Sequence, residues 1–385
     1  MVACPGLIDL HAHLREPGYE YKETIATGAL AASRGGFTTI CCMPNTDPPI
    51  DSGPLIEFVL RRAREAGLEL ADLEELAAAG AVAFSDDGDP VQDANLMRMA
   101  LTYGADLGKP VSNHCEDLLL SADGVMAEGA IATRLGLAGI PPAAEDAMIA
   151  RDIALAASTG GRLHVAHVST AGSVPLVRRA KELGLNVTAE VCPHHLTITD
   201  EWALGTKGNG AGSSEQAYDT STKVYPPLRN RSDVEALVEA LADGTIDCIA
   251  TDHAPHDVAT KQVTYEDAAF GISVLETALG SSMQLFHLGR ISLPVLVERL
   301  TAGPARVLGA EYIPLASLAP GTPADVLLFD PDQEWTVNAG DFASKGKNTP
   351  LDGTNLRGRV VATIAAGKII HQSGQLRLQE ADESA

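Results

Sequence analysis

The sequence is poor in aromatic residues and in basic residues, and it has no long hydrophobic run. Phe, Trp and Tyr make up 4% of its 385 residues. Lysines and arginines number 28 against 51 aspartates and glutamates, so the formal net charge is −23. This excess of negative charge argues against nucleic acids and anionic membrane surfaces as partners. No apolar segment approaches the ~20 residues that a membrane-spanning helix needs.

Cysteine is also scarce, and its six residues form neither a C-x-x-C pair nor the framework of a small disulfide-rich domain. Scattered cysteines of this kind are typical of free thiols in a reducing compartment, and we expect them to pack in the core. No basic-then-apolar leader precedes the first predicted strand. These features predict a soluble, cytoplasmic protein.

What the sequence does contain is a regular alternation of short apolar strands with helical segments. Strands are expected at 6–11, 37–42, 81–85, 110–114, 163–168, 186–191 and 246–251. Helices are expected at 22–34, 54–66, 70–79, 93–107, 145–159, 172–183, 233–242, 273–288 and 292–300. This alternation is typical of parallel β/α units. It predicts an α/β fold, a TIM-like barrel of the (β/α)8 type, for which the chain is long enough.

The pattern changes after Pro320, where strands are expected at 324–330, 334–337 and 359–370. We therefore expect two units, a β/α barrel over residues 1–310 and a small β-rich appendage with a polar tail over 311–385. The glycine- and serine-rich segment 205–222 is interpreted as a mobile surface loop. This loop and the stretch 257–268 are the candidate lids of a site.

The strongest chemical signal lies in the first strand, GLIDLHAHLREPG at 6–18. Alternation along a strand places Asp9, His11, His13 and Arg15 on one face. Two imidazoles on one face can bind a single metal ion, and Arg15 lies where an anion could reach it. A buried strand whose histidines are only hydrogen-bonded fits the same pattern, so this strand alone does not decide.

Histidine or aspartate also recurs at the carboxyl ends of the strands, where β/α barrels hold their active sites. Six of the seven strand ends carry such residues: His11 and His13, Asp86 and Asp87, His114, His167, His194 and His195, and Asp252 with His253 and His256. A mixed histidine and carboxylate metal centre needs this set of residues. The sequence therefore predicts a metal site at the carboxyl end of the barrel.

Some histidines are interpreted as structural. His164 is out of phase with His167, so we expect it to face the surrounding helices. His194 and His195 are adjacent, so we expect at most one of them to point inward, and neither is assigned as a ligand.

Three further histidines have simple expected roles outside the ligand set. We expect His253 to be a hydrogen-bonding partner of Asp252. His287 lies late in a predicted helix and His371 in the β appendage, where surface or capping positions are expected.

Nine short motifs run in order from the first strand to the end of the barrel: DLHAHLREPG (9–18), MPNT (43–46), SDDG (85–88), NHCED (113–117), HVAHVST (164–170), AEVCPHH (189–195), PPLR (226–229), ATDHAPH (250–256) and AFGI (269–272). Together they resemble the class I dihydroorotases of the amidohydrolase superfamily. The resemblance covers most of the chain, and the combination of HLREPG, MPNT and TDHAPH is very specific.

The resemblance implies a hydrolase of cyclic amides that works in de novo pyrimidine biosynthesis. Its substrates would be N-carbamoyl-L-aspartate and L-dihydroorotate, and its cofactor one or two Zn²⁺ ions per subunit. The implied ligands are His11, His13 and Asp252 for the first ion and His114 and His167 for the second. Many superfamily members bridge their metals with a carboxylated lysine, but 81–85 has none. Asp87, preferred over Asp86, would take that place.

The resemblance also implies a substrate site next to the metals. Asp252 would act as general base and then as general acid. The residues expected to hold the substrate are Arg15, Asn45 and His256 for its carboxylate and the backbone near Phe270 and Gly271 for its ring. Tyr225 stands where the family usually has an asparagine before PPLR. Either its hydroxyl replaces that contact or its ring fills different space.

Two segments that the family usually has are not found in this sequence. The first is a longer stretch before the first strand, which completes the appendage, so exposed strand edges are expected there. The second is a barrel strand between the helices at 54–66 and 70–79. Because a closed barrel links strand number, tilt and stagger, seven strands should leave a gap or force a rearrangement.

Two other functions remain open at this stage. One is a non-catalytic dihydroorotase-like subunit that scaffolds aspartate carbamoyltransferase. The other is a different cyclic amidohydrolase, a hydantoinase or allantoinase, although those lack the pair Arg15 and Asn45. We expect a homo-oligomer with a small-molecule substrate, and aspartate carbamoyltransferase is the candidate protein partner.

Overall fold

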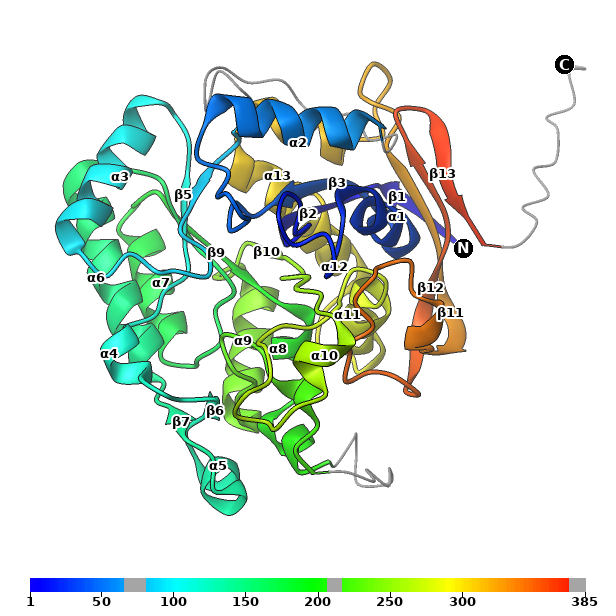
Figure 1. Cartoon of the computed structure of the whole chain (residues 1–385). Coiled ribbons are helices and arrows are strands. Elements are labelled where there is room, and N and C mark those ends of the chain that lie inside the picture. The colour runs from blue at the N-terminus through cyan, green and yellow to red at the C-terminus, as the bar shows by residue number, and fades with distance from the viewer. Residues whose placement is uncertain (66–80, 206–216, 374–385) are drawn as a thin grey trace, which may run out of the picture.

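In a computed structural model, which describes residues 1–65, 81–205 and 217–373, a parallel β/α barrel lies beside an antiparallel sheet. Figure 1 shows the barrel with its helices around it and the antiparallel sheet on its right. The chain is an α/β protein, as predicted.

In the described ranges, seven parallel strands form the barrel, and each lies within or next to a predicted segment. They are β2 (Leu7–Ala12), β3 (Phe37–Cys42), β4 (Phe84–Ser85), β5 (Val111–Asn113), β8 (Leu163–Val165), β9 (Val187–Val191) and β10 (Cys248–Ile249). Their pairing gives one sheet in the order β10-β9-β8-β5-β4 and a second sheet of β2 and β3. A bridge between Ala12 and His253 connects β2 to the chain beyond β10.

The major helices follow these strands and cover the outside of the barrel. They are α1 (Ile25–Gly35), α2 (Gly53–Glu65), α3 (Ala94–Asp106), α6 (Ala143–Thr159), α7 (Ser173–Glu182), α9 (Arg231–Asp243), α11 (Ala278–His287), α12 (Leu293–Leu300) and α13 (Ala302–Leu308). Side-chain caps set several starts: Thr24, Asp93 and Asn230 each accept a backbone N–H of the first turn. None of the described helices is both long and apolar enough to cross a membrane.

As far as the structure describes the chain, the barrel is open between β3 and β4. Within the described residues, neither strand pairs with another strand at the edge that faces this opening. A cavity of about 480 Å³ lies there, lined by apolar side chains such as Ile40, Val59 and Ala83. The described part of the chain thus has the seven strands and the gap that the sequence predicts. The helix expected at 70–79 lies outside the described residues.

The antiparallel sheet has the order β1-β11-β12-β13. Its strands are β1 (Val2–Pro5), β11 (Val326–Thr336), β12 (Asn355–Ala365) and β13 (Lys368–Gln372). The sequence predicted the last three only in outline, because the segments expected at 324–330 and 334–337 form one strand with a register shift between Asp330 and Glu334. β1 was not predicted, and it pairs with β11, so it covers one edge that we expected to be exposed. The boundary near residue 310 stays a prediction.

Shorter elements complete the fold. They are α4 (Leu118–Ser121), β6 (Met126–Ala127), α5 (Ala130–Leu135), β7 (Gly139–Ile140), α8 (Pro193–Thr197) and α10 (Val258–Lys261), with 3-10 turns at 200–204, 220–222, 310–316 and 339–341. The β6–α5–β7 segment projects at the lower left of Figure 1. Of the loop expected at 205–222, residues 206–216 lie outside the described residues. Residues 220–222 form one of the 3-10 turns, capped by Asp219.

Candidate metal centre

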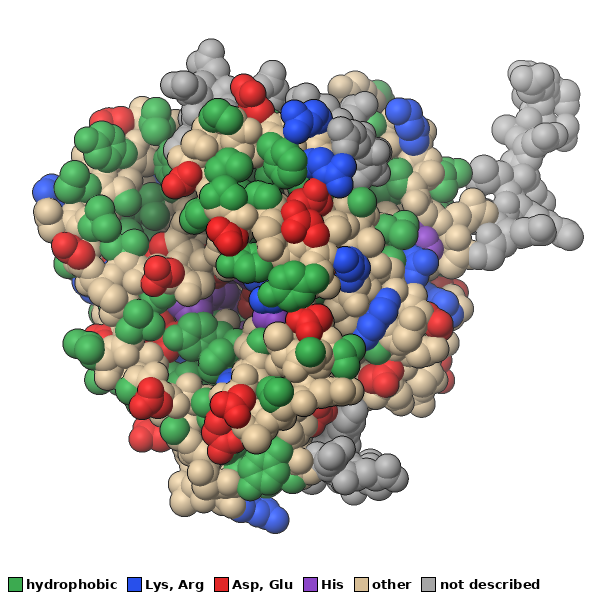
Figure 2. Space-filling view, in the orientation of Figure 1, with side chains coloured by type: hydrophobic (Ala, Val, Ile, Leu, Met, Phe, Trp, Pro, Cys, Tyr) green, Lys and Arg blue, Asp and Glu red, His purple; other side chains and the backbone are tan. Residues whose placement is uncertain are grey.

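The six predicted ligands meet at the carboxyl end of the barrel strands. They are His11, His13, Asp87, His114, His167 and Asp252, and none is more than 6% exposed. Figure 2 shows histidine side chains at the bottom of a hollow near the middle of one face. The apolar cavity at the barrel opening is a separate space, because none of the six lines it.

Asp87 lies among four imidazoles. Its Oδ1 is 3.1 Å from Nε2 of His11 and 3.3 Å from Nε2 of His167. Its Oδ2 is 3.3 Å from Nε2 of His13, and its Oδ1 is 3.6 Å from Nδ1 of His114. Although burial opposes ionisation, these imidazoles hold the pKa of Asp87 well below its usual range. Its position suits a group that bridges two cations.

Asp86 is directed elsewhere. Its carboxylate accepts hydrogen bonds from the backbone N–H groups of His114, at 2.9 Å, and Val91, at 2.8 Å. Burial raises its pKa to about 6. The geometry therefore favours Asp87 over Asp86, as the spacing predicts.

Asp252 approaches the same space from the loop after β10. Its Oδ1 is 3.1 Å from Nε2 of His13 and 3.6 Å from Nε2 of His11. Burial opposes its ionisation, but the hydrogen bond from His13 and the nearby imidazoles lower its pKa to about 2. Asp252 is thus an ionised carboxylate at neutral pH, ready to accept a proton.

Three site residues hold backbone conformations that are rare outside glycine. The φ angles are 59° at Arg15, 32° at His167 and 45° at Asp252. Such strain persists only where the surrounding structure holds it, and it is common at functional sites. All three residues lie two or three positions beyond the carboxyl ends of their strands, β2, β8 and β10.

The left-handed residue at 167 also explains a wrong expectation. His164 does not face the helices, since its Nε2 lies 3.1 Å from Oε2 of Glu190 and its Nδ1 lies 2.8 Å from Oγ1 of Thr188. The strand β8 ends at Val165, so the phase that separates 164 from 167 in a regular strand does not hold. Both histidines therefore face the barrel interior.

Glu190 was not predicted as a site residue, and it is the main support of His11. Its Oε1 lies 2.9 Å from Nδ1 of His11, while its Oε2 accepts the contact from His164. His11 therefore donates its Nδ1–H to Glu190 and directs Nε2 toward Asp87 in the centre. Alternation along β9 is the signal that could have identified Glu190, because it puts Glu190 on the inner face with Thr188.

Two other ligands are supported in the same way. Nδ1 of His13 lies 2.9 Å from Oδ1 of Asn45, and Nε2 of His114 lies 3.1 Å from Oε2 of Glu116. Metal-binding histidines usually donate their second N–H to a carboxylate or carbonyl in this manner. Asn45, expected only as a substrate contact, is thus also a partner of His13.

The donor set fits a metal. Nε2 of His11 is buried and makes no hydrogen bond, although Asp87 is only 3.1 Å away. Burial opposes protonation of His114, but Asp87 and Glu116 raise its pKa to about 10. A metal ion must displace that proton and would then neutralise the same carboxylates. Two groups, His11–His13–Asp252 and His11–Asp87–His167, each place their ligand atoms within 4.8 Å of one another.

The residues expected to hold a carboxylate lie beside this centre. Arg15 Nη2 is 3.4 Å from Nε2 of His256, which lies 2.7 Å from the carbonyl oxygen of Phe270. Nε of Arg15 and Nδ1 of His256 are buried without a hydrogen-bond partner. Burial and the charge of Arg15 lower the pKa of His256 to about 2, so this imidazole is neutral. Arg15 therefore has an unused donor for an anion.

Tyr225 forms part of the wall of the site. Its ring centroid is 4.8 Å from those of both His114 and Phe270. Burial and the neighbouring Glu116 carboxylate raise the pKa of its hydroxyl. Of the two interpretations of Tyr225, the ring position fits the one in which it fills space.

The backbone at Gly271 is already engaged within the protein. Its N–H donates to the carbonyl of Lys223 at 2.9 Å, and its own carbonyl accepts from Nδ2 of Asn348 at 2.9 Å. Its φ is 123°, and a Cβ added at this position would lie 2.6 Å from Cβ of Ala254, so a residue with a side chain does not fit in place of Gly271. Gly271 thus shapes the loop that carries Phe270.

His253 is not a partner of Asp252, contrary to expectation. Its Nδ1 accepts the backbone N–H of Val274 at 3.0 Å, and its Nε2 lies 3.4 Å from Oε2 of Glu23. The adjacent side chain points away from Asp252 because the chain pairs here with Ala12 as a strand. His253 fastens this loop to the elements around it.

Comparisons with known proteins agree with this geometry. A sequence profile of the family described as dihydro-orotase-like matches residues 1–173. A dihydroorotase from Pelotomaculum thermopropionicum is 52% identical over 389 residues, which covers 97% of this chain and 88% of the relative. One from Syntrophus aciditrophicus is 47% identical over 388 residues, with the same shares covered.

Among solved structures, the L-hydantoinase (dihydropyrimidinase) from Arthrobacter aurescens has a TM-score of 0.80 at 25% identity. The match covers 97% of this chain and 86% of the hydantoinase chain. The fold is thus shared with hydantoinases, but sequence identity is about twice as high to the dihydroorotases. The chain belongs to the dihydroorotase family of the amidohydrolase superfamily.

Proposed function

We propose that this chain is a metal-dependent dihydroorotase that interconverts N-carbamoyl-L-aspartate and L-dihydroorotate. The observation that carries the proposal is the joint position of two groups of residues. Six buried metal donors converge, and Arg15 with its unused Nε lies directly beside them. A cyclic amide with a carboxylate needs both.

We propose Zn²⁺, one or two ions, as the metal. His11, His13 and Asp252 would hold one ion, His114 and His167 the other, and Asp87 would bridge them. When bound, the metal acidifies water and polarises the carbonyl of the cyclic amide. The histidine and carboxylate donors suit zinc.

The side chains of this protein supply the proton transfer and the orientation. Asp252 is ionised at neutral pH, so it takes the proton of the attacking water and gives it to the nitrogen that leaves. Arg15 grips the substrate carboxylate with a planar pair of donors. Asn45 uses its oxygen to hold His13, which leaves its amide N–H₂ for the same carboxylate.

The walls of the site exclude water from the reacting amide. The rings of Tyr225 and Phe270 lie against each other, and Tyr225 lies against His114. His256 fixes the Phe270 backbone through its carbonyl oxygen. An apolar wall of this kind strengthens the charge interactions inside the site.

The experiment that tests this function is a comparison of dihydroorotate, hydantoin and allantoin as substrates for the purified chain. We expect ring opening of dihydroorotate alone. Arg15→Gln should raise KM for dihydroorotate at least ~10-fold, because a charged hydrogen bond to the carboxylate is lost. Equal turnover of hydantoin would contradict the proposal, and so would a KM that Arg15→Gln leaves unchanged.

We propose aspartate carbamoyltransferase and a second copy of this chain as protein partners, on the family resemblance. Size-exclusion chromatography of the chain, with and without the transferase, tests both. A non-catalytic scaffold would bind the transferase and would not turn over dihydroorotate even when metal is bound. An active enzyme turns over dihydroorotate in the complex or alone.

A further inference from the structure

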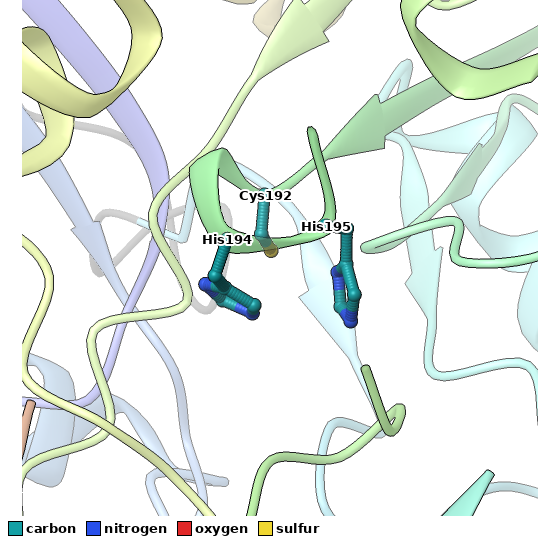
Figure 3. Close-up of side chains that lie close together, drawn as sticks. All are labelled: Cys192, His194 and His195. Atoms are coloured by element: carbon teal, nitrogen blue, oxygen red, sulfur yellow. The ribbon is translucent and has the colours of Figure 1, made fainter. Parts of the chain in front are cut away.

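A second group of potential metal ligands lies outside the six donors described above. Cys192 directly precedes α8, and His194 and His195 lie on its first turn. All three are buried, with 0%, 4% and 2% of their surfaces exposed. Their ligand atoms lie within 4.8 Å of one another. Figure 3 shows the sulfur of Cys192 and a nitrogen of each imidazole facing the space between the three side chains.

The hydrogen bond of His195 fixes which of its nitrogens carries the proton. Nε2 lies 3.0 Å from the carbonyl oxygen of Pro226, which can only accept, so Nε2 carries the hydrogen. Nδ1 is therefore an unprotonated nitrogen, and it is buried without a hydrogen-bond partner. Histidines that bind a metal characteristically donate their other N–H to a backbone carbonyl in this way.

His194 is more unusual, because both of its ring nitrogens are buried without a hydrogen-bond partner. Its ring centroid is 4.4 Å from that of His195, with a tilt of 53° between the planes. A buried polar group without a partner is costly, so it needs an explanation. An ion between the three side chains would bind the free nitrogens of both imidazoles at once.

We propose that Cys192, His194 and His195 form a second metal site that takes Zn²⁺. One thiolate and two imidazoles are a donor set for zinc and for softer ions, whereas the centre described above has four imidazoles, two carboxylates and no sulfur. Binding breaks the S–H bond of Cys192 and forms a sulfur–metal bond, and the proton leaves to solvent. Solvent or a substrate group completes the coordination.

Cobalt substitution of the full chain tests the proposal independently of activity. A chelator removes bound metal, and Co²⁺ is then added while the near-ultraviolet and visible spectra are recorded. The six donors of the proposed catalytic centre include no sulfur, so a thiolate-to-Co²⁺ charge-transfer band reports a cysteine outside that centre, and single cysteine variants identify which one. We expect this band in the wild type. In Cys192→Ser we expect the band to disappear and the metal content to fall by about one ion per chain.

The matched control is Cys248→Ser. Cys248 is also 0% exposed and lies in another potential ligand group, with His164 and Glu190. We expect Cys248→Ser to keep the band. A band that survives in Cys192→Ser, or that Cys248→Ser removes, overturns the proposal.

A second variant covers the case in which Cys192→Ser does not fold. In His195→Gln, the side-chain amide can still donate to the carbonyl of Pro226, but position 195 no longer offers an imidazole nitrogen to the ion. We expect a folded protein, by circular dichroism, that loses one equivalent of metal and at least half of the band. If wild-type protein shows no band, the proposal is wrong and His194 is satisfied by water in the neighbouring cavity of about 10 Å³. If the wild-type protein shows the band but does not turn over dihydroorotate, the result contradicts the proposed function and not the second metal site.

Discussion

The carboxyl end of the barrel and the described side between β3 and β4 differ in how completely their groups are paired. At the carboxyl end, three of the four histidines in the centre have a hydrogen-bonding partner for a second ring nitrogen, namely Glu190, Asn45 or Glu116. At the open side, two strand edges face an apolar cavity of about 480 Å³. In the described part of the chain, a tightly constrained site thus lies in a barrel whose strands β3 and β4 do not pair with each other.

The difference teaches that the predicted metal donors keep short mutual distances although, among the described residues, no strand pairs with the facing edges of β3 and β4. All six donors come from strands or strand ends on either side of the opening. Two site residues flank it in sequence, Asn45 just after β3 and Asp87 just after β4.

The largest effect should come from Asp252→Asn. The variant keeps the shape of the side chain but cannot take up a proton, so turnover of dihydroorotate should fall ~10³-fold. Steady-state kinetics measure this, and thermal melting by circular dichroism checks the fold. Asp332→Asn, at an exposed position, should be unaffected. Turnover near the wild-type value in Asp252→Asn would refute its assigned role.

The next effect concerns the support of the centre. Glu190→Gln offers one acceptor where two imidazoles now donate, so the affinity for metal should fall about 10- to 100-fold. Competition with a chelator of known affinity measures it. Ser112→Ala, which changes a residue lining the cavity at the opening, is the control and should leave the affinity unchanged. Equal affinities in all three proteins would mean that the support contributes nothing.

A pH effect is expected from the segment beside the site. Burial and the charge of Lys223 lower the pKa of Lys261 to about 7, against ~10.4 in an unfolded chain. Between these values the unfolded chain holds a proton that the folded chain has released, so stability rises with pH. The slope is at most about 1.4 kcal/mol per pH unit. The slope approaches zero as the pH falls below about 7, where the folded and unfolded chains both hold the proton.

Urea unfolding at pH values from about 7 to about 9.5 measures that slope. Lys261→Met should flatten it, whereas Lys368→Met, at an exposed position of β13, should not. An unchanged slope in Lys261→Met would show that this lysine keeps its proton when the protein folds.

The smallest effect compares two buried isoleucines in strands. Ile249 is 0% exposed on the closed side, and Ile40 is 7% exposed and lines the cavity. Truncation of a buried isoleucine to alanine usually costs about 2–5 kcal/mol. Ile40→Ala should cost about 1 kcal/mol less than Ile249→Ala, because fewer contacts surround it. Equal costs in urea unfolding would show that the opening is packed as well as the closed side.

The convergence of the six candidate ligands was predictable because their positions follow local rules. Alternation in β2 puts His11 and His13 on one face, and parallel strands bring their carboxyl ends together. His164 was not predictable, because the left-handed backbone at His167 breaks the phase on which the expectation rested. The expectation for His253 failed since its partners, Val274 and Glu23, come from distant segments.

The same limits apply to the fold. The bounds of β3 and the caps of α1 and α3 follow from short sequence signals. β1 does not, because four residues form a strand there only through pairing with β11, more than 300 residues away in the chain. The place of Tyr225 between His114 and Phe270 likewise depends on three separate loops.

The most direct test of an intact centre in an open barrel is to measure metal content and dihydroorotate turnover on one sample of the purified chain. The account predicts bound zinc in the centre and ring opening of dihydroorotate, both lost together in His13→Ala. A well-folded chain that binds no metal at these residues, or that binds metal and does not turn over dihydroorotate with or without the carbamoyltransferase, would contradict it.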